Sequence, residues 1–429
     1  MELLILGIFS AALLGCIILD ISILYALAFG LVLFLLYGRH KGFSGQELAA
    51  MAFEGIYTIR NMLLTFVLIG VLTAFWRAAG TISLIVLSAS ALIRPSIFLL
   101  MTFLLNCAVS VLTGTAFGTS ATMGVICATM AQTMGIDLWL VGGAVLSGAY
   151  FGDRCSPVST SALLISELTD TVIYDNIRRM IRSALVPFLL SCAVYALVGF
   201  AASHAGTMMD LRSLFDREFV FHIAAFVPAA VILLLSALRV NVRLTMTASI
   251  LAALPLCVFL QGIPLKELLR TAVFGFTAAD AEVGAMINGG GIVSMLKVIG
   301  IVCLSSSYSG IFRKTGLLDS VKRGIEILAE KTTAYTAMLA TSVIGCMVAC
   351  NQTLTIMLEN QLCQGLKKDP SDYALNLEDT AVITAPLIPW SIACTVTLTA
   401  VGAPVKAIFL ACFLYLLPLW RAGESVFRR

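Results

Sequence analysis

A single aspartate inside an otherwise apolar stretch is the residue of this sequence best suited to chemistry. Asp153 follows Gly152 and precedes a Ser156-Pro157 pair. A carboxylate at membrane depth costs about 3 kcal/mol even on the milder insertion scales, so its presence indicates a function. When ionised it would bind a cation, and when neutral it would hold a proton, so the two would compete for one group. The alternative is a salt bridge from Asp153 to a lysine or arginine at the edge of a loop.

Hydroxyl and amide side chains gather near this aspartate and at two further breaks in the apolar pattern. A hard cation prefers oxygen ligands, and glycines at positions 114 and 118 allow the chain to unwind and free backbone carbonyls. We expect Asp153 and Asn351 to contact a transported cation. The alternative is that these small residues only pack helices against one another. The expected neutral ligands are Thr113, Thr115, Thr119, Ser156, Ser159, Thr160, Asn351, Gln352 and Thr355.

Two more acidic positions are candidates for a second titrating group. Glu359 lies two helical turns after Asn351, on roughly the same helix face. Glu378 and Asp379 precede a segment with two prolines three residues apart, which forbids a regular helix. We expect Glu359 or Asp379 to titrate during the reaction. For Glu378 and Asp379 the alternative is that they cap and solvate the start of a helix.

The elements that position these residues are membrane helices. The chain has 429 residues, of which 60% are hydrophobic and only 12% charged, about half the charge of a soluble domain. This predicts an all-α polytopic membrane protein with about 10 to 12 transmembrane segments, some broken or re-entrant, in a lipid bilayer. No basic run with interleaved aromatics indicates nucleic-acid binding. The clearest apolar windows are 3–19, 21–37, 62–79, 96–112, 184–202, 219–238, 244–260, 292–308, 335–349 and 403–420.

An internal repeat organises these windows. Residues 42–55 return as residues 262–275 with an offset of 220 residues, and Trp76-Arg77 returns as Phe312-Arg313 with an offset of 236. The same offset of 236 relates Thr115 to Asn351. We expect two repeats of inverted topology, with the polar breaks meeting near the membrane midplane. The expected division is a first repeat over 1–165, a connector with a linking helix over 166–218, and a second repeat over 219–429.

The distribution of lysine and arginine predicts the orientation. Arg39, His40 and Lys41 form one basic loop, and Arg178, Arg179 and Arg182 belong to a second. The positive-inside rule places these loops and the N-terminus in the cytoplasm, in the inner membrane of a prokaryotic cell.

Three segments resemble the NhaC-type sodium/proton antiporter family of the larger ion-transporter superfamily. Residues 113–119 are similar to its threonine- and glycine-rich motif, residues 152–159 to its glycine, aspartate and serine-proline motif, and residues 351–352, 378–380 and 386–390 to its C-terminal signature. The resemblance spans residues 40–400 in consistent order. It implies a scaffold part, a transport part with two broken-helix elements, a homodimer, and alternating access. One position departs from the family: Thr160 stands where an aspartate is expected.

The favoured function is therefore Na⁺/H⁺ antiport, with no cofactor beyond the transported Na⁺ and H⁺. The rival is exchange of a small organic solute, a carboxylate or an amino acid, because the broken helices offer N-termini that attract anions and because Thr160 replaces an acid. An enzyme is disfavoured, since only three histidines occur and none belongs to an HExxH motif. A passive channel remains an alternative that uphill transport would exclude.

Overall fold

The structure is a computed structural model, and it describes residues 2–19, 21–58, 60–90, 95–157, 159–202, 211–238, 240–315, 325, 327–366 and 369–427. These residues are almost entirely helical, and the described part contains no strand beyond one bridge between Phe276 and Gly289. The expected all-α class is confirmed. In the first half the helices are α1 (Glu2–Ile18), α2 (Ile23–His40), α3 (Gly45–Thr58), α4 (Arg60–Ala78), α5 (Thr81–Ser90), α6 (Phe98–Thr113), α7 (Ala116–Thr119), α8 (Val125–Thr133), α9 (Leu138–Cys155), α10 (Thr160–Thr169), α11 (Ile173–Ala202) and α12 (Leu211–Phe215).

The second half is also helical and contains 3-10 and π-helical turns. One π-helical turn, Glu378–Val382, follows α21 directly, and another, Ser120–Gly124, follows α7 in the first half. The helices of the second half are α13 (Val227–Ala237), α14 (Val242–Pro255), α15 (Leu265–Phe274), α16 (Ala281–Ile287), α17 (Ile292–Thr315), α19 (Ala334–Ala349), α20 (Gln352–Cys363), α21 (Pro370–Leu377), α22 (Ile392–Ala400) and α23 (Cys412–Phe427).

Only some of these helices are long enough to cross a bilayer alone. Among the described residues three are both long and apolar enough: Pro95–Thr113, Ile173–Ala202 and Arg243–Leu260. Two bent pairs, Leu63–Ala78 with Thr81–Ser88 and Pro370–Leu387 with Ile392–Ala400, raise that number to five. Shorter apolar helices cover several other windows, because glycines, prolines and wide turns divide the apolar stretches. The exact number of crossings therefore stays a prediction.

Helices α6 and α9 pack extensively against each other in the core. Gly148 and Gly152 of α9 lie directly against the backbone of α6, where a Cβ atom on either glycine would collide with it. Backbones approach this closely only where side chains are absent. The contact brings the C-terminal end of α9, with Asp153, beside the C-terminal end of α6.

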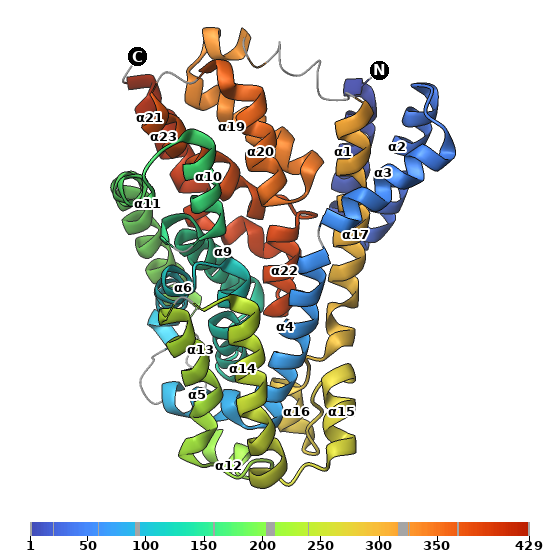
Figure 1. Cartoon of the computed structure of the whole chain (residues 1–429). Helices are drawn as coiled ribbons and strands as arrows, with labels where there is room; N and C mark the ends of the chain where they lie inside the picture. Colours follow the sequence, from blue (N-terminus) through green and yellow to red (C-terminus); the bar gives the residue numbers. More distant parts are fainter. Residues whose placement is uncertain are drawn as a thin grey trace.

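Helices of the first half pack against helices of the second half. Helix α3 of the first half packs on α17 of the second, and α15 of the second half packs on α4 of the first. Glycines allow two close approaches: Gly55 of α3 meets the backbone of Ser306 in α17, and Gly70 of α4 meets the backbone of Gly291 just before α17. Helix α3 lies in the upper half of Figure 1 and α15 at its lower end. The repeated stretches 42–55 and 262–275 thus occupy opposite ends of the molecule.

The α3–α17 crossing generates a stability prediction. A Cβ atom on Gly310 of α17 would collide with the carbonyl oxygen of Met51 in α3, which is backbone and cannot rotate away. We expect Gly310→Ala to destabilise the protein by about 1–3 kcal/mol, the usual range for overpacking, measured as a lower thermal midpoint in detergent. The matched control is Gly300→Ala on the same helix, where a Cβ would make an ordinary 3.4 Å contact with Leu24. Equal midpoints for both variants would contradict the prediction.

Candidate ion-binding site

Two breaks in the helices, one in each half, form the framework of the site. Helix α6 ends at Gly114, which has a φ of 64°, and Thr115 then caps α7 by accepting the Gly118 N–H at 3.2 Å. Helix α19 ends at Cys350, with a φ of 54°, and Asn351 then caps α20 by accepting the Thr353 N–H at 2.9 Å. Both breaks have a left-handed residue followed by an extended capping residue, 236 positions apart.

The Cys350 conformation is the less favourable of the two. A residue with a Cβ atom in the left-handed region costs about 1–2 kcal/mol, whereas glycine adopts it freely. The Cys350 N–H bonds to the Cys346 carbonyl at 3.0 Å, and the Gly114 N–H bonds to the Ser110 carbonyl at 2.8 Å. The same backbone hydrogen bond therefore closes both helices despite the different residue.

Asp153 lies between these breaks and is 6% exposed. Its Oδ1 accepts the Ser159 hydroxyl at 3.2 Å and its Oδ2 accepts the Gln352 side-chain amide at 3.0 Å. No lysine or arginine pairs with Asp153 among the described residues. The salt-bridge interpretation of Asp153 is therefore not what the described part of the structure shows.

A cavity of about 70 Å³ opens beside this carboxylate. It is lined by side chains from both halves, including the candidates Thr115, Thr160, Asn351 and Gln352. A volume of this size holds on the order of two water molecules, so it suits a small cation with part of its water shell better than an organic molecule. No group of three or more His, Cys, Asp or Glu side chains that could hold a metal occurs in the described chain. A cation here would rest on Asp153 and neutral oxygens.

Four other candidate residues do not line the cavity and support its walls instead. The Thr119 hydroxyl donates to the Thr115 carbonyl at 2.9 Å and lies 3.1 Å from the Thr113 hydroxyl. The Ser156 hydroxyl donates to the Val111 carbonyl at 2.7 Å, which ties the end of α9 to α6. The Thr355 hydroxyl donates to the Asn351 carbonyl at 2.9 Å. These hydroxyls satisfy backbone groups near the breaks, which lipid could not do.

Asp379 belongs to a different cluster. Its Oδ1 pairs with Arg154 and its Oδ2 with Arg421, the latter at 2.8 Å, and the Asp379 and Arg154 side chains are fully buried. Arg154 also donates to the Met180 carbonyl at 2.9 Å and to the Ser183 hydroxyl at 2.8 Å. The alternative interpretation of Asp379, a solvated cap, does not fit the structure, because the side chain is fully buried in the π-helical turn. Both carboxyl oxygens of Asp379 are thus already taken up by arginines, which leaves neither free to bind a transported cation.

Glu359 is buried apart from the Asp153 cavity. Its Oε1 accepts the Thr380 hydroxyl at 2.7 Å and its Oε2 accepts the Ser342 hydroxyl. It lies on α20, two turns beyond Asn351 as the sequence predicts, but the cavity lining does not include it.

Glu378 is a buried carboxyl that the sequence pattern does not single out as a site residue. It is fully buried, and neither of its carboxyl oxygens has a hydrogen-bond partner among the described residues. The charged groups that act on it are Arg154, Asp153 and Asp379. The available signal was its position beside Asp379 in a segment too apolar to be solvated. The residue was instead interpreted as a cap.

Comparison with known proteins gives a consistent result. The sequence profile of the Na⁺/H⁺ antiporter family matches residues 2–169 and again residues 148–420. The chain is 30% identical over 400 residues to a malate-2H⁺/Na⁺-lactate antiporter of Bacillus subtilis, covering 90% of this chain and 85% of that protein. It is 28% identical to the Na⁺/H⁺ antiporter NhaC of the same organism, with coverage of 88% and 86%. It is 24% identical to NhaC of Alkalihalophilus pseudofirmus, with coverage of 89% and 85%.

The Arg154–Asp379–Arg421 cluster generates a second stability prediction. Replacing Asp379 by alanine would leave the fully buried Arg154 without its ion pair and Arg421 with Glu424 alone. Loss of one partner of a buried pair costs about 3–5 kcal/mol, so we expect little folded protein after purification in detergent. The control is Asp372→Ala, because Asp372 forms an exposed pair with Arg179 at 2.7 Å worth about 0–1 kcal/mol. If Asp379→Ala keeps the native thermal midpoint but loses transport, Asp379 instead belongs to the transport machinery.

Proposed function

This chain belongs to the Na⁺/H⁺ antiporter family and is a secondary antiporter, and on that basis we propose that it exchanges Na⁺ for protons at Asp153. The proposal rests on one observation: Asp153 is a buried carboxylate that lacks a cationic partner among the described residues and faces a cavity lined by both breaks. An ionised carboxylate in such a place needs a cation, and without one it needs a proton.

The neighbours of Asp153 fit both states. The Ser159 hydroxyl and the Gln352 amide donate to its two oxygens and so stabilise the ionised form that binds Na⁺. A protonated carboxyl can instead donate its proton to an acceptor such as the Ser159 oxygen. Na⁺ and H⁺ therefore exclude one another at a single group, and this exclusion couples their movements in opposite directions. Glu359 and Glu378 are the buried carboxyls available for a second proton, in preference to the doubly paired Asp379.

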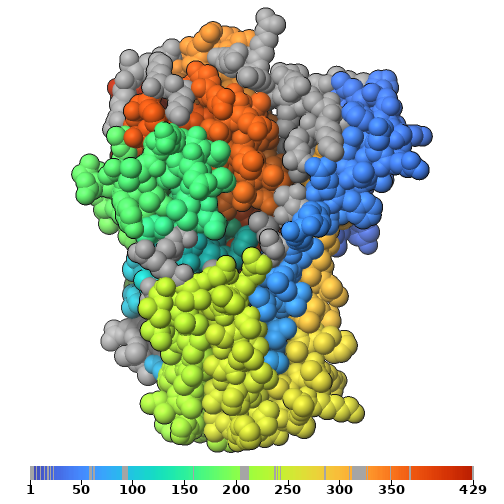
Figure 2. All heavy atoms as spheres, in the orientation of Figure 1, coloured from blue at the N-terminus to red at the C-terminus, as the bar shows by residue number. Residues whose placement is uncertain are grey.

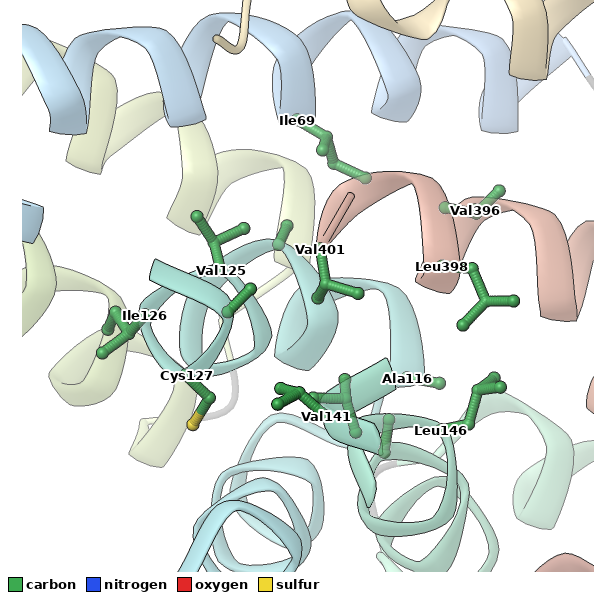
Figure 3. Packing of buried hydrophobic residues seen from close by; sticks show 14 of the residues in the cluster. Ile69, Ala116, Val125, Ile126, Cys127, Val141, Leu146, Val396, Leu398 and Val401 are labelled. Carbon is green, nitrogen blue, oxygen red and sulfur yellow. The ribbon is translucent and has the colours of Figure 1, made fainter. Parts of the chain in front are cut away.

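Access to the cavity differs between its two sides. Thr160 and Thr353 line the cavity and are exposed, on the side of α10 and α20. In Figure 2 the surface is hollowed between the green and orange parts that contain these helices. On the other side α22 packs on the segment from η2 (Ser120–Gly124) to α9, with Val401, Leu398 and Leu146 among the buried side chains of Figure 3. This apolar block supports a closed barrier toward that side.

The wider arrangement is part of the same proposal. The matching breaks at Gly114 and Cys350, and the exchange of α3 and α15 between opposite ends, support two inverted repeats with boundaries near 1–165 and 219–429. Alternating access would then move the Asp153 region against the α3–α17 scaffold. We also propose that the N-terminus is cytoplasmic, that the protein lies in a prokaryotic inner membrane as a homodimer, and that it uses no cofactor.

A second candidate function is the exchange of a small organic anion. It is favoured by the relative that is 30% identical and carries the name of a malate and lactate antiporter. It also fits Thr160, which lines the cavity at a position where the NhaC-type pattern has an acid. Addition of malate or lactate outside vesicles loaded with the other anion would separate the two functions.

The central prediction concerns Asp153. In sealed proteoliposomes with a pH-sensitive dye inside, addition of Na⁺ outside should drive proton efflux with the native chain. The asparagine of Asp153→Asn carries no charge and can neither bind nor release a proton. We therefore expect no cation-driven efflux above that of empty vesicles. The control is Asp137→Asn, an exposed position, which should transport normally. Undiminished efflux with Asp153→Asn, from protein of native thermal midpoint, would overturn the proposal.

The same competition fixes the sign of the pH dependence. While the carboxyl is mostly protonated, each unit of rising pH should lower the Na⁺ concentration for half-maximal exchange by about tenfold, until the group is fully ionised. Initial rates of efflux at several Na⁺ concentrations and at pH values from about 4 to about 8 would measure it. A half-maximal concentration that does not change with pH would mean that Na⁺ and H⁺ bind at separate groups.

A further inference from the structure

A second polar cavity lies at the other end of α22, the helix that it shares with the Asp153 site. Its volume is about 190 Å³, and its walls come from α4, α8, α17, the glycine-rich segment before α17, and the C-terminal end of α22. Gln132, Asn288 and Gly402 at its rim are exposed. Arg77 is the only charged residue in its lining, and no acid takes part. Such a cavity attracts anions.

Arg77 differs from the other arginines buried in the core. Arg154 pairs with Asp379, and Arg421 pairs with Asp379 and Glu424. Arg77 pairs with no carboxylate among the described residues, and its Nε is cut off from solvent without a hydrogen-bond partner. An unpaired guanidinium in a partly buried place is costly unless something else supplies an anion.

The surrounding backbone holds the Arg77 guanidinium in place. Its Nη1 donates to the Ile287 carbonyl at 2.6 Å and to the Asn288 carbonyl at 3.1 Å. These carbonyls are positioned by Gly289, Gly290 and Gly291, whose φ values are 133°, 77° and 80°. A Cβ atom on Gly290 would lie 2.5 Å from the Ala74 nitrogen, so the segment must be glycine to press against α4. The arginine is thus held beside the cavity before any ligand arrives.

We propose that this cavity binds a small organic carboxylate at Arg77. Nη1 is occupied by the two backbone carbonyls and Nε is cut off from solvent, so the N–H groups of Nη2 are the donors of Arg77 that remain for a carboxylate. Thr73, Thr129 and Gln132 supply hydroxyl and amide groups for a further hydroxyl or amino substituent. The volume is below the 300–1,000 Å³ of pockets for drug-sized ligands, so the ligand is a metabolite of about ten non-hydrogen atoms or fewer. The link to transport rests on the secondary-antiport function, but the binding itself does not.

The cavity is separate from the Asp153 site. Helix α22 contributes its first residues, Ile392 and Ala393, to the Asp153 cavity and its end at Thr399 and Ala400 to the Arg77 cavity. At 1.5 Å per residue these two ends lie about 10 Å apart. Val401 lines the Arg77 cavity and also closes the apolar block of Figure 3. The carboxylate would therefore be held on the closed side of the barrier.

The test is a binding measurement that needs no ion gradient. Purified protein in detergent would be titrated with L-malate, L-lactate and succinate by equilibrium dialysis, in the absence of Na⁺. We expect saturable binding of at least one, weakened on the order of ten- to a hundredfold by Arg77→Gln, because a hydrogen bond to a charged group is lost. Arg77→Lys should bind more weakly than the native chain, since lysine keeps the charge but lacks the planar guanidinium group with its several N–H donors. The matched control is Arg60→Gln, at the exposed start of the same helix, which should bind normally.

Further variants keep the outcome clear. Gln132→Leu changes an exposed rim residue without touching the guanidinium, so it should fold and still weaken binding. Asp153→Asn should bind the carboxylate as the native chain does, whatever happens to Na⁺/H⁺ exchange. The proposal is overturned if the native chain binds none of the three anions, if Arg77→Gln binds them equally well, or if Asp153→Asn abolishes binding. None of these results bears on exchange at Asp153, which is measured separately.

Discussion

The structure depends on the rule that backbone polar groups within a bilayer must find partners inside the protein. Both helix breaks obey it with their own residues. Thr115 and Asn351 cap the helices that follow, and the hydroxyls of Thr119 and Thr355 bond to the freed carbonyls. Only after the backbone is satisfied does a polar space remain for Asp153. The cavity is small because most of the polar atoms around it already have partners.

Buried charged side chains likewise find partners inside the protein. Asp379 and its two arginines form a closed cluster that holds α9, the π-helical turn and α23 together. Asp153, one residue before Arg154, has hydroxyl and amide donors but no cation among the described residues. Adjacent residues of one helix thus differ in their surroundings: Arg154 belongs to a closed ion-pair cluster, whereas Asp153 faces the cavity.

The sequence predicts the membrane helices, the two breaks and the central carboxylate, because glycine, proline and isolated acids stand out in an apolar pattern. Thr115, Thr160, Asn351 and Gln352 line the cavity as expected, since they follow the breaks directly. The division between lining and supporting hydroxyls is not predictable, because it depends on the rotation of each helix at its break. The surroundings of Glu378 and Asp379 are not predictable from the sequence either. A π-helical turn changes the direction in which successive side chains point, and no local sequence pattern indicates such a turn.

That π-helical turn, Glu378–Val382, has a mechanical consequence. It contains one residue more than an α-helical turn, so the helix carries one residue of slack at the point where its carboxyls lie. If the slack moved along the chain by one residue, the segment would rotate by about 100° while its ends stayed packed. The direction in which Glu378 and Asp379 face is therefore set locally, by the position of one extra residue, and not by the orientation of the whole helix.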